Sequence, residues 1–341
     1  MARTHSHNQS RYLFLVVAAM IAATSIAGTP AAQTIYRPPR TADGKPDLQG
    51  VWTNASITTL QRDKRYPSLA IPPDQVAAAT LSHPQVVRQD TDDAGDQGTQ
   101  TLDGSDLARG RGYNAFWIDP GREFGLVKGE RRSSWIIDPS DGKIPYTAQG
   151  RKAIEHFEAE RDNYDGPEAR PPADRCMYAG QRVGPPMLNG LYNNNYQIVQ
   201  TRDYVVILVE MVRHGRIIPI KHNLKDRQHL GRNMTPLFGD SIGWWEGDTL
   251  VVESTQFSPL QANSIVSLTP NSKVIERFTR SSAKQLLYEF TVEDEFFYAK
   301  PWRGELSFNA SKEQLFEYAC HEGNYAMTGI LAGAREQEKR K

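Results

Sequence analysis

The sequence predicts a mainly β protein in which residues 191–341 form an antiparallel β-barrel or a strongly curved, calycin-like sheet. Short apolar runs recur every roughly ten to fifteen residues after residue 191, and no helical period separates them. Two of these runs, KVIERFT and QLLYEFTVE, place most of their large apolar residues at every second position, which is typical of half-buried strands. A sheet with so many strands requires closure or a second layer to protect its edges.

The expected strands share short length and apolar content, and they lie in YQIVQTRDYVVILVEMV (196–212, two strands), RIIPI (216–220), 250–253, KVIERFT (273–279), QLLYEFTVE (285–293), ELSFNA (305–310) and QLFEYAC (314–320). The tripeptide Glu246-Gly247-Asp248 precedes the strand at 250–253. Gly247 supplies the positive φ that a tight turn needs. A solvent-facing turn is therefore favoured over a pair of catalytic carboxylates.

The segment 33–190 is predicted to be extended and loop-rich. Prolines near its start exclude a helix there, and the Gly- and Asp-rich stretch 88–112 is typical of a long loop. Helical spacing occurs at 148–162, where Ile154 and Phe157 are three residues apart and charges cover the other positions. We expect one or two short helices in the chain, one of them near 148–162.

Residues 1–32 predict a cleaved signal peptide. Arg3 and Arg11 are their only charged residues, an apolar run of signal-peptide length follows, and small residues suited to cleavage come next. No later stretch is apolar for long enough to cross a bilayer. We therefore expect a periplasmic or secreted protein without membrane insertion.

The charge balance argues against a nucleic-acid partner. The chain has 40 basic and 40 acidic residues, and removal of residues 1–32 takes away two arginines and no acid, which leaves a net charge of −2. Nucleic-acid-binding domains carry a basic stripe instead. A small-molecule substrate or ligand is the expected partner, and the oligomeric state stays open.

The chain has two cysteines, Cys176 and Cys320. In an oxidising compartment such a pair predicts one disulfide, with two free thiols as the alternative. A bridge across so long a loop stabilises by about 4–5 kcal/mol in the chain-entropy model. It would fix the end of the chain against its middle.

Two glutamates are expected among buried strand residues. Glu210 continues one face of the apolar strand 204–209, so its carboxylate must be ion-paired, hydrogen-bonded or protonated. Either Arg213 or Arg216 pairs with it, or it is a general acid or base in a pocket. Glu276 raises the same alternatives among the apolar residues of its own strand.

Histidines supply further candidates. His321 follows the expected disulfide, which would hold it rigidly as an acid or base oriented by Glu322; the alternative is a turn that ends a strand. Four residues crowd into one polar segment and provide a possible metal site: His214, His222, Asp226 and His229. Their spacing matches no named motif, and a polar loop is the favoured interpretation.

Aromatic and amide groups provide candidate ligand contacts. Tyr192, Asn194 and Tyr196 belong to YNNNY, which is typical of a turn and also offers polar contacts to a ligand. Trp244 and Trp245 are adjacent strand residues and point to opposite faces, so one of them faces the interior. That tryptophan either packs in the core or forms a ligand wall.

Several common catalytic motifs are absent from the sequence. There is no G-x-S-x-G, no H-E-x-x-H, no P-loop and no G-x-G-x-x-G after a strand. We therefore expect no nucleotide or other cofactor and no resident metal.

The motifs nevertheless resemble those of a family of exported, largely uncharacterised bacterial proteins. The shared segments are GKPDLQGVW (44–52), YQIVQTRDYVVILVEMV (196–212), RIIPI (216–220), GDSIGWWEGDTLVVESTQF (239–257), ERFTR (276–280), LYEFTVED (287–294) and YACHEGNY (318–325). The resemblance implies that His229, Asp240, Glu276 and His321 matter. Where that family carries a histidine after EMV, this chain has Arg213.

Together these features predict an exported β-barrel enzyme that works by cofactor-independent acid–base catalysis, as a lyase, isomerase or hydrolase on a small organic or glycosidic substrate. The expected catalytic residues are Glu210, His321, Glu276 and His229. The expected substrate-binding residues are Tyr192, Asn194, Tyr196, Arg213, Asp240, Trp244 and Trp245. A lipocalin-like binding protein and a metal-dependent hydrolase are the alternatives.

Overall fold

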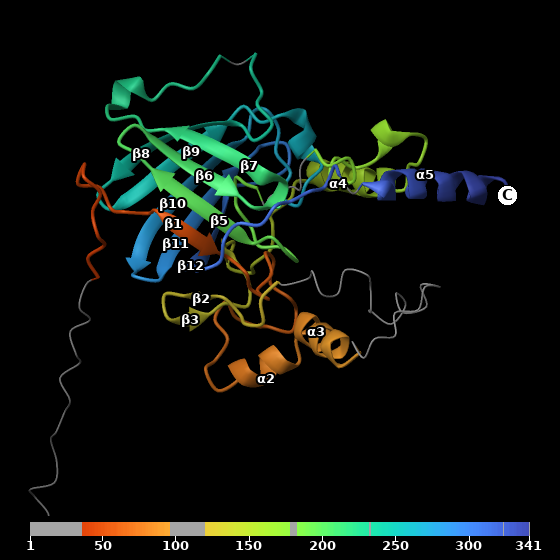
Figure 1. Ribbon diagram of the computed structural model, residues 1–341, viewed down its shortest axis with the longest axis horizontal. Coiled ribbons are helices and arrows are strands. Elements are labelled where there is room, and N and C mark those ends of the chain that lie inside the picture. The colour runs from red at the N-terminus through yellow and green to blue at the C-terminus, as the bar shows by residue number, and fades with distance from the viewer. Residues whose placement is uncertain (1–35, 96–119, 178–182, 232, 323, 341) are drawn as a thin grey trace, which may run out of the picture. The chain divides into compact units, whose positions relative to one another are not determined.

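The computed structural model describes residues 36–95, 120–177, 183–231, 233–322 and 324–340 (Figure 1). The chain divides into two units, Met1–Arg37 and Pro38–Lys341. The expected signal peptide at 1–32 and the second part of the expected loop at 88–112 lie outside the described residues. Within the described ranges, no helix has the length and apolar character needed to cross a bilayer.

A ten-stranded antiparallel sheet dominates the second unit, which confirms the predicted fold class (Figure 1). Nine strands follow one another in the order β7-β6-β5-β1-β12-β11-β10-β9-β8, and β4 pairs separately with β12. The strands are β1 (Gly50–Thr53), β4 (Ile136–Asp138), β5 (Asn195–Gln200), β6 (Tyr204–Val209), β7 (His214–Pro219), β8 (Asp240–Glu246), β9 (Thr249–Thr255), β10 (Lys273–Ser282), β11 (Gln285–Glu293) and β12 (Trp302–Ala310). A small separate hairpin consists of β2 (Leu126–Val127) and β3 (Glu130–Arg131).

The two ends of this sheet approach each other and nearly close it into a barrel. Nine strands that alternate in direction leave the first and the last parallel, and Ile220, just after β7, forms a parallel bridge with Gly243 of β8. The Lys221 N–H donates to the Gly243 carbonyl over 2.7 Å. A Cβ on Gly243 would lie only 3.0 Å from Cγ2 of Ile218, so the missing side chain permits this close approach.

Alternate residues of the long strands fill the barrel. On β10, Val274, Glu276 and Phe278 are buried, and the β11 residues from Leu286 to Val292 alternate in the same way. This is the pattern that the sequence predicts for KVIERFT and QLLYEFTVE. Because burying one large apolar side chain contributes about 1.5–3 kcal/mol, the inward row is the main source of cohesion.

The N-terminal region completes the barrel instead of forming a separate layer. The short strand β1 lies between β5 and β12 and pairs with the C-terminal end of β12. The strand β4 pairs with the N-terminal end of β12. The segment 183–188 is buried throughout against the same core. The expected boundary at residue 190 therefore does not separate the sheet from the region before it.

The described residues contain four α-helices, α2 (Val76–Leu81), α3 (Pro84–Gly95), α4 (Ala148–Glu160) and α5 (Tyr325–Glu338), together with the short 3-10 turns Pro167–Ala169, Met211–Arg213, Leu224–Asp226 and Pro259–Ala262. The prediction of a helix near 148–162 is confirmed by α4, whose Ile154 and Phe157 pack on the core.

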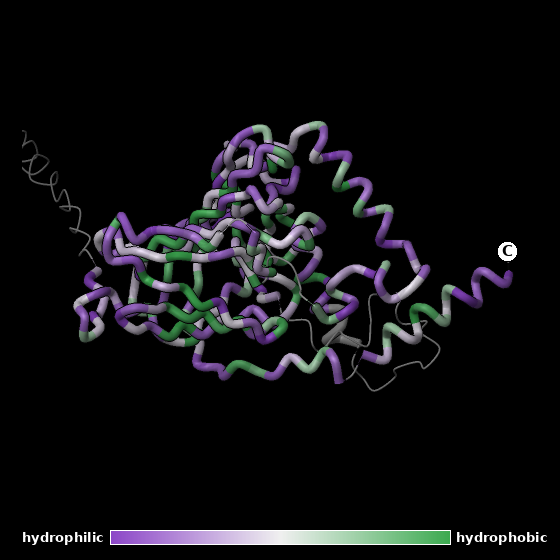
Figure 2. The backbone as a smooth tube through the Cα atoms, turned by 90° about the horizontal axis from the view of Figure 1, so that it is seen from above, coloured by the Kyte–Doolittle hydropathy of each residue, from purple (hydrophilic) through white to green (hydrophobic). Residues whose placement is uncertain are grey.

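Two local predictions are wrong, and the described residues contain four α-helices where one or two were expected. Residues 88–95 belong to α3 and not to a loop, and the expected strand at 314–320 has no regular structure. The helix α5 is unexpected, because glycines interrupt its weak apolar stripe and its C-terminal end is polar (Figure 2).

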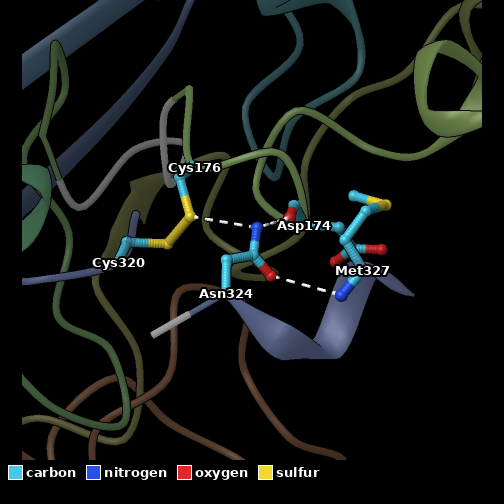
Figure 3. Close-up of a disulfide and its surroundings, with 5 residues drawn as sticks. All are labelled: Asp174, Cys176, Cys320, Asn324 and Met327. Atoms are coloured by element: carbon cyan, nitrogen blue, oxygen red, sulfur yellow. Dashed lines mark hydrogen bonds between the residues drawn. A yellow bond between two sulfur atoms is a disulfide. The ribbon is translucent and has the colours of Figure 1, made fainter. Parts of the chain in front are cut away.

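The disulfide between Cys176 and Cys320 is confirmed, and it spans 144 residues (Figure 3). Asn324 lies beside it and caps α5, because its side-chain oxygen accepts from the Met327 N–H over 3.3 Å. The same side chain donates to the Asp174 carbonyl over 3.1 Å. The bridge therefore fixes the start of α5 against the loop around Asp174.

Candidate functional site

Glu276 lies inside the barrel and is completely buried. Arg216 of β7 binds it with both ends of its guanidinium, over 2.9 and 2.5 Å. The Tyr288 hydroxyl donates to the same carboxylate over 2.7 Å and accepts from the Met187 N–H over 2.9 Å. Burial raises the pKa of Tyr288 well above its usual value, so the phenol stays a donor. This cluster is a compensated ion pair with a structural role.

Glu210 lies at the end of β6, where the chain leaves the sheet, and it is 3% exposed. Its two carboxylate oxygens accept hydrogen bonds from the side-chain amides of Asn193, over 2.5 Å, and Asn195, over 2.8 Å. Within the described ranges it has no ion pair, because Arg216 binds Glu276 and Arg213 contacts Glu317. The Glu–Arg pair considered for Glu210 therefore does not form.

The backbone around Glu210 is strained. Asn193, Val212 and Arg213 have φ values of +53°, +61° and +52°. Asparagine tolerates this region, whereas a β-branched valine rarely adopts it. Such strain costs about 1–3 kcal/mol per residue and clusters at functional sites, where the surrounding structure maintains it. Val212 and Arg213 follow Glu210 closely in sequence, and Asn193 is one of its two amide donors.

Glu210 also lines a cavity of about 480 Å³. Arg213 and Gln197 line the same cavity, and residues 311–316 form its opposite wall. This size falls within the roughly 300–1,000 Å³ that is usual for small-molecule sites. The cavity thus combines a buried carboxylate with an exposed guanidinium.

Four carboxylate side chains in the described part of the chain are buried: Glu210, Glu276, Asp294 and Glu305. Glu276 has Arg216, and Glu305 has Arg132 and Lys128 at 2.7 and 2.6 Å. Asp294 accepts from two backbone N–H groups after it and from two hydroxyl side chains, as a turn cap does. Glu210 differs because neutral amides hold it and it faces a cavity.

His229 belongs to a second polar cluster, beside the first residue of β8 and near the last residues of β9. Its Nδ1 lies 2.7 Å from Asp240 and its Nε2 lies 3.2 Å from Glu253. The Leu230 N–H also donates to Asp240, over 3.0 Å. Both ring nitrogens are thus engaged by carboxylates, which fixes the orientation of the ring.

The residues of the possible metal site do not converge. The ring of His214 packs on Phe238 at 4.0 Å, His222 contacts Asp203, and Asp226 accepts from Asn223. The described residues contain no cluster of three or more His, Cys, Asp or Glu side chains arranged to hold a metal ion. Burial, followed by the charge of Arg216, lowers the pKa of His214 to about 4.

The four expected catalytic residues do not lie together in one pocket of the described structure. His321 is exposed on the turn after Cys320, whereas Glu276 is sealed in the barrel. Glu210 and His229 lie near the ends of different strand pairs, β5–β6 and β8–β9. Strand order separates them, and that order is set by pairings between residues far apart in sequence.

The expected binding residues also separate. Asn194 is buried and closes its own loop onto Gly190, at 2.7 and 3.0 Å. Tyr196 packs in the core, where its hydroxyl accepts from Asn54 over 3.2 Å. Tyr192 lines a different cavity from Glu210, whereas Arg213 lines the same one. Asp240 is the partner of His229.

The two tryptophans point to opposite faces, as predicted. Trp245 packs on the core, and Trp244 lies outside under Arg227, whose guanidinium is 4.1 Å from the ring. Gly247 has φ +60° in the expected turn between β8 and β9. Glu246 there binds Trp244 and Arg277, which lower its pKa in that order, so the turn carboxylate is structural.

Sequence reasoning missed the roles of Asn193 and Asn195. The signal in the sequence is the density of amide side chains in YNNNY, but the left-handed backbone of Asn193, which brings both amides to one carboxylate, is not visible there. No family model, curated protein or solved structure matches this chain. The chemistry of the site therefore follows from its own side chains.

Proposed function

We propose that this protein is an exported enzyme that performs cofactor-independent acid–base chemistry on a small organic molecule, as a lyase, isomerase or hydrolase, in the cavity lined by Glu210 and Arg213. The observation that carries the proposal is a buried carboxylate without a cationic partner on the wall of a cavity. Burying a charge without an opposite charge is costly, and functional sites are where such costs persist. The disulfide supports export, because structural disulfides persist in oxidising compartments.

In this proposal Glu210 accepts a proton from the substrate or from a water that attacks it. The two asparagine amides fix the carboxylate's orientation, which keeps its basic oxygen in reach of a bound molecule. Arg213 supplies the positive charge that stabilises the anion formed when the proton leaves. Both side chains lie beside strained backbone, which keeps the loop in one conformation.

The test is hydrogen–deuterium exchange at substrate carbon, because proton abstraction from carbon is visible even without net conversion. The protein is incubated in D₂O with a panel of 2-hydroxy acids, sugar acids, their esters and simple glycosides, and ¹H NMR follows loss of C–H signals and appearance of products. The Glu210→Gln variant should abolish exchange and conversion. Glu313→Gln is the matched control, because Glu313 lines the same cavity but is exposed.

Retention of activity in folded Glu210→Gln would contradict the assignment of Glu210. If a panel compound binds but is neither exchanged nor converted, the result would contradict catalysis and favour the lipocalin-like binding protein. The panel therefore separates the enzyme from the binding protein that would use the same cavity.

A further inference from the structure

Tyr192 and Met211 line a second cavity, of about 500 Å³. It lies among α4, the loop 171–174, residues 263–267 and Tyr318. Tyr192 and Met211 line this cavity, whereas their sequence neighbours Asn193 and Glu210 form the site proposed above. The segment 210–213 therefore contributes different side chains to the two cavities, Met211 to this one and Glu210 and Arg213 to the other.

Four aromatic residues line this second cavity: Tyr146, Phe157, Tyr192 and Tyr318. They come from four separate chain segments, and each is only partly buried. Burial raises the pKa of Tyr146, so its phenol stays protonated and able to donate. Tyrosine combines an apolar ring with a polar hydroxyl, which suits a ligand that has both apolar faces and polar edges.

The polar part of the lining disfavours an anionic ligand. Glu158 and Asp174 are two carboxylates, and Arg161 is the cation among the described lining residues. Asp174 is already bound by Arg170, over 2.9 Å. Amide and hydroxyl groups at Asn263, Ser264 and Ser267 complete the polar lining. Hydroxyl groups of a neutral ligand would find both donors and acceptors here.

Covalent and capping contacts hold the two sides of this cavity in place. Cys176 follows Asp174 by two residues and Cys320 follows Tyr318 by two, so the disulfide ties together two segments that line the cavity. Figure 3 shows the bridge close to Asp174. Asn324 adds its hydrogen bond to the Asp174 carbonyl. A pre-formed site loses less conformational entropy when a ligand binds, which favours binding of small molecules.

We infer that this cavity binds a neutral sugar, mono- or disaccharide in size. A sugar ring offers C–H faces that pack on aromatic rings and hydroxyl groups that pair with carboxylates, amides and serines. A purely aromatic ligand would make no polar contact with the exposed Glu158 carboxylate or the Arg161 guanidinium, and an anion would meet two carboxylates. The inference does not depend on the chemistry proposed for Glu210.

The test is saturation-transfer difference NMR on the full exported chain, with D-glucose, D-galactose, cellobiose and maltose as probes. D-glucuronate tests the effect of negative charge, and 4-methylphenol is the planar aromatic competitor. Tyr318→Leu and Tyr192→Leu remove single rings from the lining. Tyr325→Leu is the matched control, because that tyrosine is 84% exposed and does not line the cavity.

We expect at least one neutral sugar to bind, with glucuronate weaker. Each ring removal should weaken binding roughly three- to tenfold, since an aromatic contact contributes about 0.5–1.5 kcal/mol and 1.4 kcal/mol is a factor of ten. Ile265 lines the cavity and is 58% exposed, so Ile265→Trp should block binding without disturbing the core. This variant keeps the test valid if a tyrosine variant misfolds.

Three results would overturn the inference. They are an absence of saccharide signals, binding of 4-methylphenol alone, and saccharide signals that persist unchanged in Tyr318→Leu, Tyr192→Leu and Ile265→Trp. Because exchange at Glu210 is measured with separate variants, failure here and failure of the proposed enzyme are distinguishable.

Discussion

Two buried glutamates of similar exposure occupy opposite kinds of environment. Glu276 faces a guanidinium and a phenol inside the sealed barrel, whereas Glu210 faces two amides on a cavity wall. The first charge is compensated, and the second is not. Burial alone therefore does not distinguish the two carboxylates, whereas the charge of the partner and access to a cavity do.

The positions of the two residues explain this contrast. Glu276 lies in the middle of β10 and points across the barrel towards β7. Glu210 lies just past the end of β6, where a strained turn begins. Strand interiors can hold only side chains that complete the core, while strand ends can present groups to a ligand. The predictions below test this division between interior and rim.

The largest effect is expected from Glu276→Gln. Loss of the carboxylate leaves Arg216 charged, buried and unpaired, and breaking such a pair costs about 3–5 kcal/mol. Urea unfolding followed by tryptophan fluorescence measures it. The double variant Arg216→Met with Glu276→Leu removes both charges and should recover most of the loss; equal destabilisation in both variants would show that the pair is not the cause.

A smaller loss is expected from Gly243→Val at the closure of the barrel. The added side chain would meet Ile218 and Ile220 at the seam between β7 and β8, and overpacking of this kind costs about 1–3 kcal/mol. Gly215→Val is the control, because no atom lies within 4 Å of its added Cβ. Thermal unfolding of both variants checks this, and equal melting temperatures would contradict the tight seam.

The pH dependence of stability should carry a contribution from His214. Its folded-state pKa is about 4, below the ordinary value of 6.5, so the unfolded chain binds a proton first. The stabilising contribution is therefore complete above pH 6.5 and is lost as the pH falls towards 4. With partial solvent screening, we expect about 1–2 kcal/mol of this loss.

His214→Phe should remove this pH dependence while keeping a ring on Phe238. The stability difference between the wild-type protein and this variant, measured by urea unfolding at several pH values, should change between pH 6.5 and 4. His222→Phe is the exposed control. A difference that stays constant with pH for His214→Phe would show that His214 is not protonated differently on folding.

The smallest stability effect is expected from Arg213→Gly, and its sign is unusual. Glycine accepts the φ of +52° without strain, and the ion pair to Glu317 is exposed and long, at 3.4 Å. Stability should stay the same or rise by up to about 1 kcal/mol, while conversion of substrate falls. Arg213→Lys keeps the charge and should retain part of the activity. A strong loss of stability in Arg213→Gly would show that the positive φ of Arg213 does not strain the backbone.

Much of the barrel was predictable because alternation is a local property. KVIERFT and QLLYEFTVE form β10 and β11 with their expected inward faces. The strand β1 escaped prediction because it is four residues long and is stabilised by partners more than a hundred residues away. The C-terminal helix escaped because glycines interrupt a weak apolar stripe.

The candidate site was predictable only in part. The sequence shows that Glu210 continues a buried strand, and its burial follows from that. The partners of Glu210 do not follow from the sequence, because Arg216 lies six residues from Glu210 yet binds Glu276, sixty residues away. Such a choice depends on strand order and register, which local patterns do not encode.

The free energy of unfolding of Glu210→Gln tests the central claim most directly. If Glu210 is an uncompensated charge held for function, the neutral amide should leave stability unchanged or raise it by up to about 2 kcal/mol, while exchange and conversion disappear. Its companion Glu276→Gln should lose about 3–5 kcal/mol under the same conditions. A comparable loss in Glu210→Gln, or activity that survives it, would contradict the account.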